Sequence, residues 1–293
     1  MRASFRVAAL EDEDALRSAF AGSAVVVNVG GPFQTTWEPV VAAALDVGAH
    51  YVDFAAEQAP LAAIFERADA SAKDAGVAVA PAMGFFGAFG DVLAALVARD
   101  LASVDELTAA YAVDGWRPTA GSREAAAAAA AQRFAWRDRS LQPVEGDPRF
   151  STFEYPEPRG ERPVLEDYPG PEAVTVPCHI DVPDVRVLMT RTTLEKVFGA
   201  GSDPVRGLQD HSDSSFALVV VATRGEQTRR AFVTGTDIYG ITAPIVGEAV
   251  ARLTTSSATG ALAPSQLLDV DGFFRALEPQ GLTVTIGDEA LGA

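Results

Sequence analysis

A short turn near the start of the chain has residue types that suit ligand binding. It follows an apolar segment, residues 24–29, that is predicted to be a buried strand. In open α/β sheets, ligands bind at the carboxyl ends of the strands, where glycines let backbone N–H groups approach a ribose or an amide. The alternative is an ordinary strand-to-helix turn. The candidate cofactor-binding residues of this turn are Asn28, Gly30, Gly31, Pro32 and Phe33.

Two acidic residues lie at the end of the next predicted strand, residues 51–55. Asp53 belongs to the strand and Glu57 follows it. Their carboxylates would either border a bound cofactor or substrate, or cap the helix that follows. Both interpretations stay open from the sequence.

Three glycines with a spacing of three residues give a competing signal. Gly84, Gly87 and Gly90 follow a predicted strand and open a helix, and Asp114 ends the strand after that. This arrangement resembles a dinucleotide fingerprint, in which glycines admit a pyrophosphate and the acid binds a ribose. The spacing differs from G-x-G-x-x-G, however, and the intervening phenylalanines would crowd a phosphate.

No residue stands out as a catalytic acid or as a metal ligand. Tyr111, Asp237 and Tyr239 are conceivable proton donors, but a buried tyrosine usually packs and makes one hydrogen bond. The sequence also lacks the G-x-S-x-G elbow of hydrolases and the phosphate loop of nucleotide hydrolases. No metal site is predicted, because the three histidines have no metal-ligand spacing: His50, His179 and His211.

Apolar segments and amphipathic helices alternate through the first part of the chain. Such a pattern predicts a doubly wound α/β fold, with a parallel sheet that helices cover on both faces. The expected strands are residues 5–10, 24–29, 51–55 and 77–82, and the expected helices are residues 12–21, 36–47, 60–75 and 91–100.

A different pattern after residue 105 predicts a second, α+β domain. We expect a partial dinucleotide-binding domain over residues 1–105 and a substrate or dimerisation domain over residues 106–293, with a C-terminal segment that returns to the first domain. Residues 137–183 are rich in proline, glycine and acids and are expected to be irregular. The other expected strands are residues 107–113, 185–189, 216–223, 228–236 and 282–286, the third and fourth of them as a hairpin, and the expected helices are residues 122–133, 242–254 and 271–277.

The composition limits the possible partners. A formal charge of −17, with no run of basic residues, disfavours nucleic acid and anionic membranes. No apolar run is long enough to span a bilayer, and the N-terminus has no signal-peptide pattern, so a cytoplasmic protein is expected. An anionic substrate would require a local cluster of arginines.

Several sequence strings together resemble the saccharopine dehydrogenase-like family of nicotinamide-dependent reductases. In that family a strand ends in an N-x-x-G-P-F turn, and the next strand ends in Y-V-D with a glutamate after it. The matching strings in the first part are VVVNVGGPF, EPVVAAALDVGAHYVDFAAEQ and AMGFFGAFGDVLA, and those in the second part are RGERPVLEDYPGPEAVTVP, GTDIYGITA and GALAPSQLLD.

The resemblance implies a Rossmann-type sheet that lacks its first strands. The family's domain opens with a strand, a glycine-rich phosphate turn, a helix and a second strand, and residues 5–10 would be the third strand. We therefore expect either an incomplete gene product or a sheet repaired by a partner or by rearrangement. The resemblance also favours the ligand-binding interpretation of the first turn, and it places Gly84 and Phe85 near the nicotinamide.

The implied function is hydride transfer between NADP or NAD and a small organic or lipid-type substrate. Relatives include saccharopine dehydrogenases and trans-acting enoyl reductases. The alternative is a catalytically silent scaffold or dimerisation protein that has lost cofactor affinity. A homodimer is compatible with either hypothesis.

Overall fold

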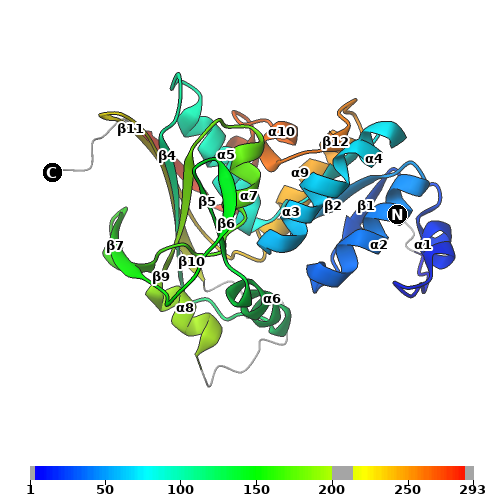
Figure 1. Ribbon diagram of the computed structural model, residues 1–293, viewed down its shortest axis with the longest axis horizontal. Coiled ribbons are helices and arrows are strands. Elements are labelled where there is room, and N and C mark those ends of the chain that lie inside the picture. Colours follow the sequence, from blue (N-terminus) through cyan, green and yellow to red (C-terminus); the bar gives the residue numbers. More distant parts are fainter. Residues whose placement is uncertain (1–3, 200–213, 288–293) are drawn as a thin grey trace.

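Two β-sheets with helices between and around them make up the computed structural model, which describes residues 4–199 and 214–287. Figure 1 shows the first sheet with its helices on the right and the second sheet on the left, with α5 and α7 between them. No helix within these residue ranges has both the length and the apolar character needed to cross a membrane.

The first sheet is parallel and confirms the predicted α/β class. Within the described residues it has four strands in the order β1-β2-β3-β12. The last strand comes from far along the chain and pairs with β3, so the C-terminal part supplies one edge of this sheet. The strands are β1 (Val25–Asn28), β2 (His50–Asp53), β3 (Ala78–Ala80) and β12 (Gly260–Ala261).

Helices cover both faces of this sheet, as the doubly wound pattern predicts. Helix α2 (Phe33–Asp46) and helix α4 (Asp69–Ala75) pack on one face, together with α1 (Glu13–Phe20) and α3 (Gln58–Arg67). Helix α9 (Thr242–Leu253) packs against β2 from the other face (Figure 1). The single helix expected over residues 60–75 is divided at Ala68 into α3 and α4.

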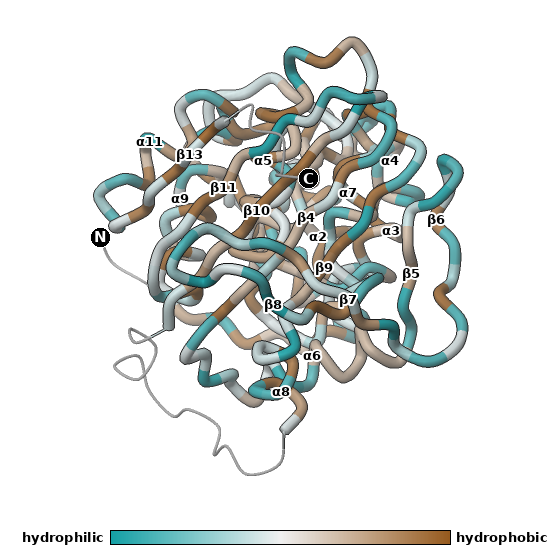
Figure 2. The backbone as a smooth tube through the Cα atoms, turned by 90° about the vertical axis from the view of Figure 1, so that its left-hand side faces the viewer, coloured by the Kyte–Doolittle hydropathy of each residue, from teal (hydrophilic) through white to brown (hydrophobic). Residues whose placement is uncertain are grey.

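The second sheet is mixed, and hydrophobic residues line its central strands β10 and β4 in Figure 2. Its main path runs β13-β11-β10-β4-β9-β5-β6, and β8 joins β9 and carries β7. The expected hairpin is confirmed, since β10 pairs with β11 in antiparallel register. The strands are β4 (Glu106–Asp114), β5 (Phe134–Arg137), β6 (Ser140–Pro143), β7 (Phe150–Tyr155), β8 (Gly160–Leu165), β9 (Asp184–Thr190), β10 (Ser215–Arg224), β11 (Gln227–Thr236) and β13 (Thr283–Gly287).

The remaining helices connect or cover the two sheets. Helix α5 lies between the sheets and contacts β10, β11 and β4. The boundary expected at residue 105 stays a prediction. The helices are α5 (Phe85–Ala98), α6 (Ala120–Ala131), α7 (Glu172–Thr175), α8 (Arg191–Phe198), α10 (Pro264–Leu267) and α11 (Phe273–Leu277), with short 3-10 turns η1 (Val176–Cys178) and η3 (Glu278–Gln280).

Two expectations about local structure are wrong. Residues 5–10 form no strand, and Phe5 and Val7 are 96% and 102% exposed. An apolar run becomes a strand only where its backbone can pair with a neighbour, and these residues have none among the described strands. Residues 137–183 are not irregular, because they contain β6, β7, β8 and α7. Exposed and half-buried residues alternate along β7, so it lacks the continuous apolar run of a buried strand.

A buried carboxylate lies where α5, α7 and β4 meet. Glu172 of α7 is fully buried and accepts a hydrogen bond from the Tyr111 hydroxyl of β4. Gly90 of α5 makes room for it, because a Cβ at that position would lie 2.1 Å from Glu172 Oε1. Burial raises the pKa of Glu172 to about 7; the hydrogen bond from Tyr111 opposes this rise and the nearby Asp91 adds to it.

This raised pKa predicts a fall in stability as the pH increases. Between pH 4.5 and 7 the unfolded chain releases a proton that folded Glu172 keeps, so the free energy of unfolding decreases. A pKa difference of this size corresponds to about 3 kcal/mol. Urea denaturation at pH 5 and pH 8 measures the loss. We expect Glu172→Gln to remove about 3 kcal/mol of it.

The exposed glutamate Glu226, in the β10–β11 turn, provides a matched control. Glu226→Gln should leave the difference between the two pH values as it is in the natural chain. An equal pH dependence in the Glu172→Gln variant would contradict the assigned ionisation of Glu172.

Candidate functional site

A buried polar network joins the carboxyl ends of β1, β2 and β3. The register places Asn28 beside Asp53, and Tyr51 bridges them: Asn28 Nδ2 donates to the Tyr51 hydroxyl at 3.1 Å, and that hydroxyl donates to Asp53 Oδ2 at 2.8 Å. Asp53 Oδ1 accepts the backbone N–H groups of Ala55 and Ala82, each at 3.0 Å. One carboxylate therefore holds the turns that follow β2 and β3.

The same network shapes the turn after β1. Asn28 Oδ1 accepts the Gly30 N–H at 3.1 Å, and the Thr36 hydroxyl at the start of α2 donates to the Gly30 carbonyl at 2.6 Å. Burial raises the pKa of Asp53 to about 6, although the N–H groups of Ala55 and Ala82 and the Tyr51 hydroxyl stabilise its charged form. The side chains of Asn28 and Asp53 thus hold the turns in place through hydrogen bonds to their backbone N–H groups.

A pocket of about 520 Å³ opens over these three turns. Its other wall comes from α6, from residues 168–171 and from the start of α9, so it lies between the two sheets. The volume is in the range of small-molecule sites. Its lining is mostly apolar and aromatic, and includes Phe33, Phe54, Phe85, Phe86, Trp116, Tyr168, Ile238 and Tyr239.

The pocket brings together most of the residues singled out from the sequence. Six of the nine line it, namely Gly31, Pro32, Phe33, Glu57, Gly84 and Phe85. The side chains of Asn28 and Asp53 lie beneath it in the polar network, and Gly30 belongs to the turn that this network shapes. Cofactor contact by any of these residues stays a prediction.

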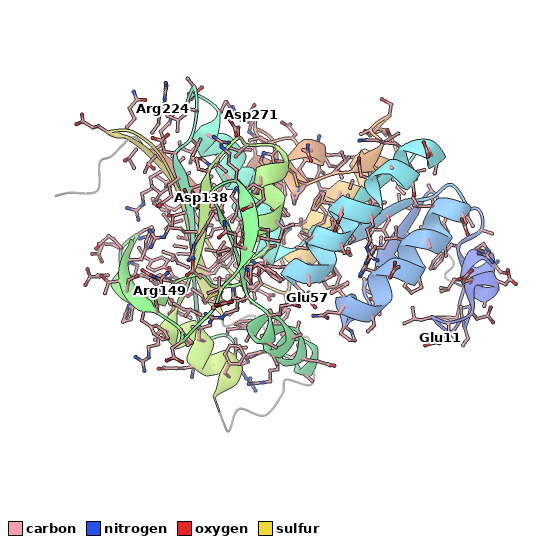
Figure 3. All side chains as sticks on the ribbon, in the orientation of Figure 1. Glu11, Glu57, Asp138, Arg149, Arg224 and Asp271 are labelled. Atoms are coloured by element: carbon pink, nitrogen blue, oxygen red, sulfur yellow. The ribbon has the colours of Figure 1, made fainter. Side chains whose placement is uncertain are left out.

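Glu57 is the buried charged residue of the pocket. It occupies the N-cap position of α3, but its side chain makes no capping hydrogen bond. Oε2 accepts the Ala56 N–H at 3.0 Å, whereas Oε1 is buried and has no hydrogen-bond partner. Burial raises the pKa of Glu57, and nearby backbone N–H groups oppose this rise in part. Figure 3 shows Glu57 at the junction between the two halves of the molecule.

A cluster of hydroxyl groups forms the opposite wall, and its central residue is Tyr239, one of the conceivable proton donors in the sequence. The Tyr239 hydroxyl accepts hydrogen bonds from Trp116 Nε1 at 3.1 Å and from the Thr119 N–H at 3.0 Å. It also lies 2.7 Å from Ser122 Oγ. Either hydroxyl can donate the hydrogen bond between Tyr239 and Ser122. The distance in sequence between residues 116–122 and 239 explains why no local motif revealed this cluster.

The glycine series proves to be required by packing. An added Cβ would lie 2.8 Å from Phe54 Cβ at Gly84, and 2.6 Å from the Ala82 carbonyl oxygen at Gly87, whose φ is +112°. Asp114 lies in the second sheet, where it forms an ion pair with Arg159. These residues therefore do not form a dinucleotide fingerprint, because the protein itself fills the space beside the glycines.

A second cluster of reactive residue types has a structural arrangement. His179 Nε2 lies 2.9 Å from Asp91 Oδ2 and 3.0 Å from Ser265 Oγ. A catalytic triad uses both ring nitrogens, whereas here one nitrogen meets both partners. Burial raises the pKa of Asp91, but His179 and Ser265 outweigh it and lower the pKa overall. The cluster joins α5 to α10 and η1.

The described residues contain no group of three or more side chains placed to hold a metal ion. His211 lies outside those residues.

Comparison with known proteins shows the fold. No family model matches the chain, and neither does any curated protein sequence. Among solved structures, it is similar to saccharopine dehydrogenase (L-Glu forming) from Saccharomyces cerevisiae, with a TM-score of 0.56 and 12% identity over 96% of this chain and 88% of that one. Amine dehydrogenase from Mycobacterium smegmatis matches with a TM-score of 0.42 and 12% identity, over 88% of this chain and 79% of that one. The chain thus shares the yeast enzyme's overall fold.

The polar network predicts different outcomes for two substitutions of Asp53. Asp53→Ala leaves the N–H groups of Ala55 and Ala82 and the Tyr51 hydroxyl without an acceptor, and we expect a loss of about 3 kcal/mol or more in the free energy of unfolding. Asp53→Asn keeps an oxygen for both N–H groups and should stay within about 1 kcal/mol of the natural chain. Urea denaturation at pH 7 measures both. Equal losses would show that the backbone acceptor is unimportant.

Proposed function

We propose that the chain is an oxidoreductase that transfers a hydride between NAD or NADP and a small organic substrate. The observation that carries this proposal is the pocket over the carboxyl ends of β1, β2 and β3, which is where open α/β sheets bind their ligands. The fold shared with the yeast dehydrogenase and the resemblance of the first turn support it.

The pocket fits the nicotinamide end of such a cofactor. Phe33, Phe54 and Phe85 offer flat apolar surfaces to a ring, and an added Cβ at Gly31 would meet open space. The bound cofactor would supply or accept the hydride. No lysine, arginine or histidine is among the described residues that line the pocket, so the cofactor phosphates would lie outside it.

The hydroxyl cluster could donate the proton that accompanies hydride transfer. Ser122 lines the pocket and shares a hydrogen bond with the Tyr239 hydroxyl, so Ser122 Oγ can donate its proton to a substrate atom and regain one from Tyr239. Trp116 Nε1 and the Thr119 N–H would then stabilise the tyrosinate that remains. Ser122 and Tyr239 are the proton-transfer residues of this proposal.

The apolar lining supports an apolar substrate, as in the lipid-type reduction by enoyl reductases that the resemblance suggests. A homodimer in the cytoplasm is part of the proposal. Light scattering of the purified protein measures its mass in solution.

Helix α6 provides a direct test of cofactor binding at this pocket. The helix buries none of its side chains, so substitutions on it should leave the fold intact. Ala125 lines the pocket, whereas Ala127 is exposed and does not. We expect saturable binding of NADH or NADPH to the natural chain, observed by nicotinamide fluorescence. Ala125→Trp should weaken it about tenfold or more, because the indole fills the ring's space.

Ala127→Trp is the matched control and should bind the cofactor as the natural chain does. Equal binding by both variants would place the cofactor elsewhere. The absence of binding at millimolar NADH and NADPH would favour the silent scaffold instead.

A further inference from the structure

Glu57 is a buried carboxylate in the wall of the pocket. The residue is 3% exposed, it lines the pocket, and its Oε2 accepts the Ala56 N–H. Burying a charged group without an ionic partner is costly. A cationic group held in the pocket beside Glu57 would offset part of this cost.

The charged residues around the pocket favour a ligand with a positive charge. Glu57 and Glu124 are the charged side chains among the described lining residues. The formal charge of the whole chain is −17. A carboxylate or phosphate group of a substrate would find no basic partner on these walls and would be repelled by Glu57. A cation is attracted.

The aromatic walls strengthen this preference. An ammonium group is attracted to the faces of aromatic rings within about 6 Å, by about 0.5–2 kcal/mol for each ring. Phe54 and Trp116 line the same pocket as Glu57, and so do Phe33, Phe85, Phe86, Tyr168 and Tyr239. A pocket whose lining includes a carboxylate and several aromatic rings is a favourable environment for an amine.

We infer that the substrate of this pocket carries a protonated amino group on an apolar body without carboxylates, and that this amino group pairs with the carboxylate of Glu57. The inference rests on the proposed function for its link to hydride transfer. It assigns Glu57 to the substrate, so the cofactor contacts fall to the aromatic lining and the first turn. A neutral alcohol could hydrogen-bond to the same carboxylate but would leave the charge of Glu57 unpaired.

Three probes of similar shape separate these possibilities: 3-phenylpropylamine, 3-phenylpropan-1-ol and 3-phenylpropanoate. Isothermal titration of the full-length chain without cofactor measures their affinities. We expect saturable binding of the amine with one site per chain, about tenfold or more tighter than the alcohol, and no binding of the carboxylate. Glu57→Gln keeps the acceptor of the Ala56 N–H but removes the charge, and it should reduce the preference for the amine to about twofold or less.

Glu66→Gln is the control for net charge. Glu66 is exposed on α3 and does not line the pocket, so this variant should retain the full preference for the amine. Thermal denaturation confirms that both variants are folded. Equal affinity for the amine and the alcohol, unchanged amine binding by Glu57→Gln, or no binding of any probe at 10 mM would each overturn the inference.

The cofactor titration is independent of these measurements. If the amine binds in a Glu57-dependent way but neither NADH nor NADPH binds, the role of Glu57 in amine recognition is supported and hydride transfer is rejected. If Ala125→Trp weakens cofactor binding but the chain shows no preference for the amine, the proposed function is supported and the assignment of Glu57 to the amine is rejected.

Discussion

The buried carboxylate of Asp53 controls the geometry of the site. It accepts two backbone N–H groups, from the turns after β2 and β3, and reaches the turn after β1 through Tyr51 and Asn28. Turns at strand ends are usually the variable part of an α/β fold, whereas a shared acceptor fixes these three relative to one another. The floor of the pocket is therefore as well defined as the sheet beneath it.

The sequence contained enough information to predict strands β1, β2 and β3 and the floor of the pocket above them, but not the edge strand β12. Its strands β1, β2 and β3 are short and mostly apolar, and glycines end the helices between them, as with Gly76 at φ +70° after α4. Parallel pairing brings Asn28 and Asp53 together at one edge once the strands are identified. The network between them was not predictable, because it depends on the position of Tyr51 and on the chain entering α2.

The opposite wall of the pocket could not be predicted in the same way. It combines α6, residues 168–171 and Tyr239, which are far apart in sequence and lie near one another only because of the second sheet. Residues 168–171 belong to the proline- and acid-rich stretch, residues 137–183, for which the sequence predicts no element. Similarly, the apolar composition of residues 5–10 indicated a strand, but strand formation depends on a neighbour that local sequence cannot supply.

The buried carboxylates of the molecule differ in how their charge is compensated. Asp91 has His179 on one oxygen and the Ser265 N–H on the other, and its pKa is lowered. Asp53 has three hydrogen-bond donors on its two oxygens. Glu172 has the Tyr111 hydroxyl on one oxygen and no partner on the other. Of these four, Glu57 is the one that lines the pocket. Burying such a charge lowers stability, and a cationic ligand beside this carboxylate would offset the cost. Glu57 would then link the stability of the fold to occupation of the site.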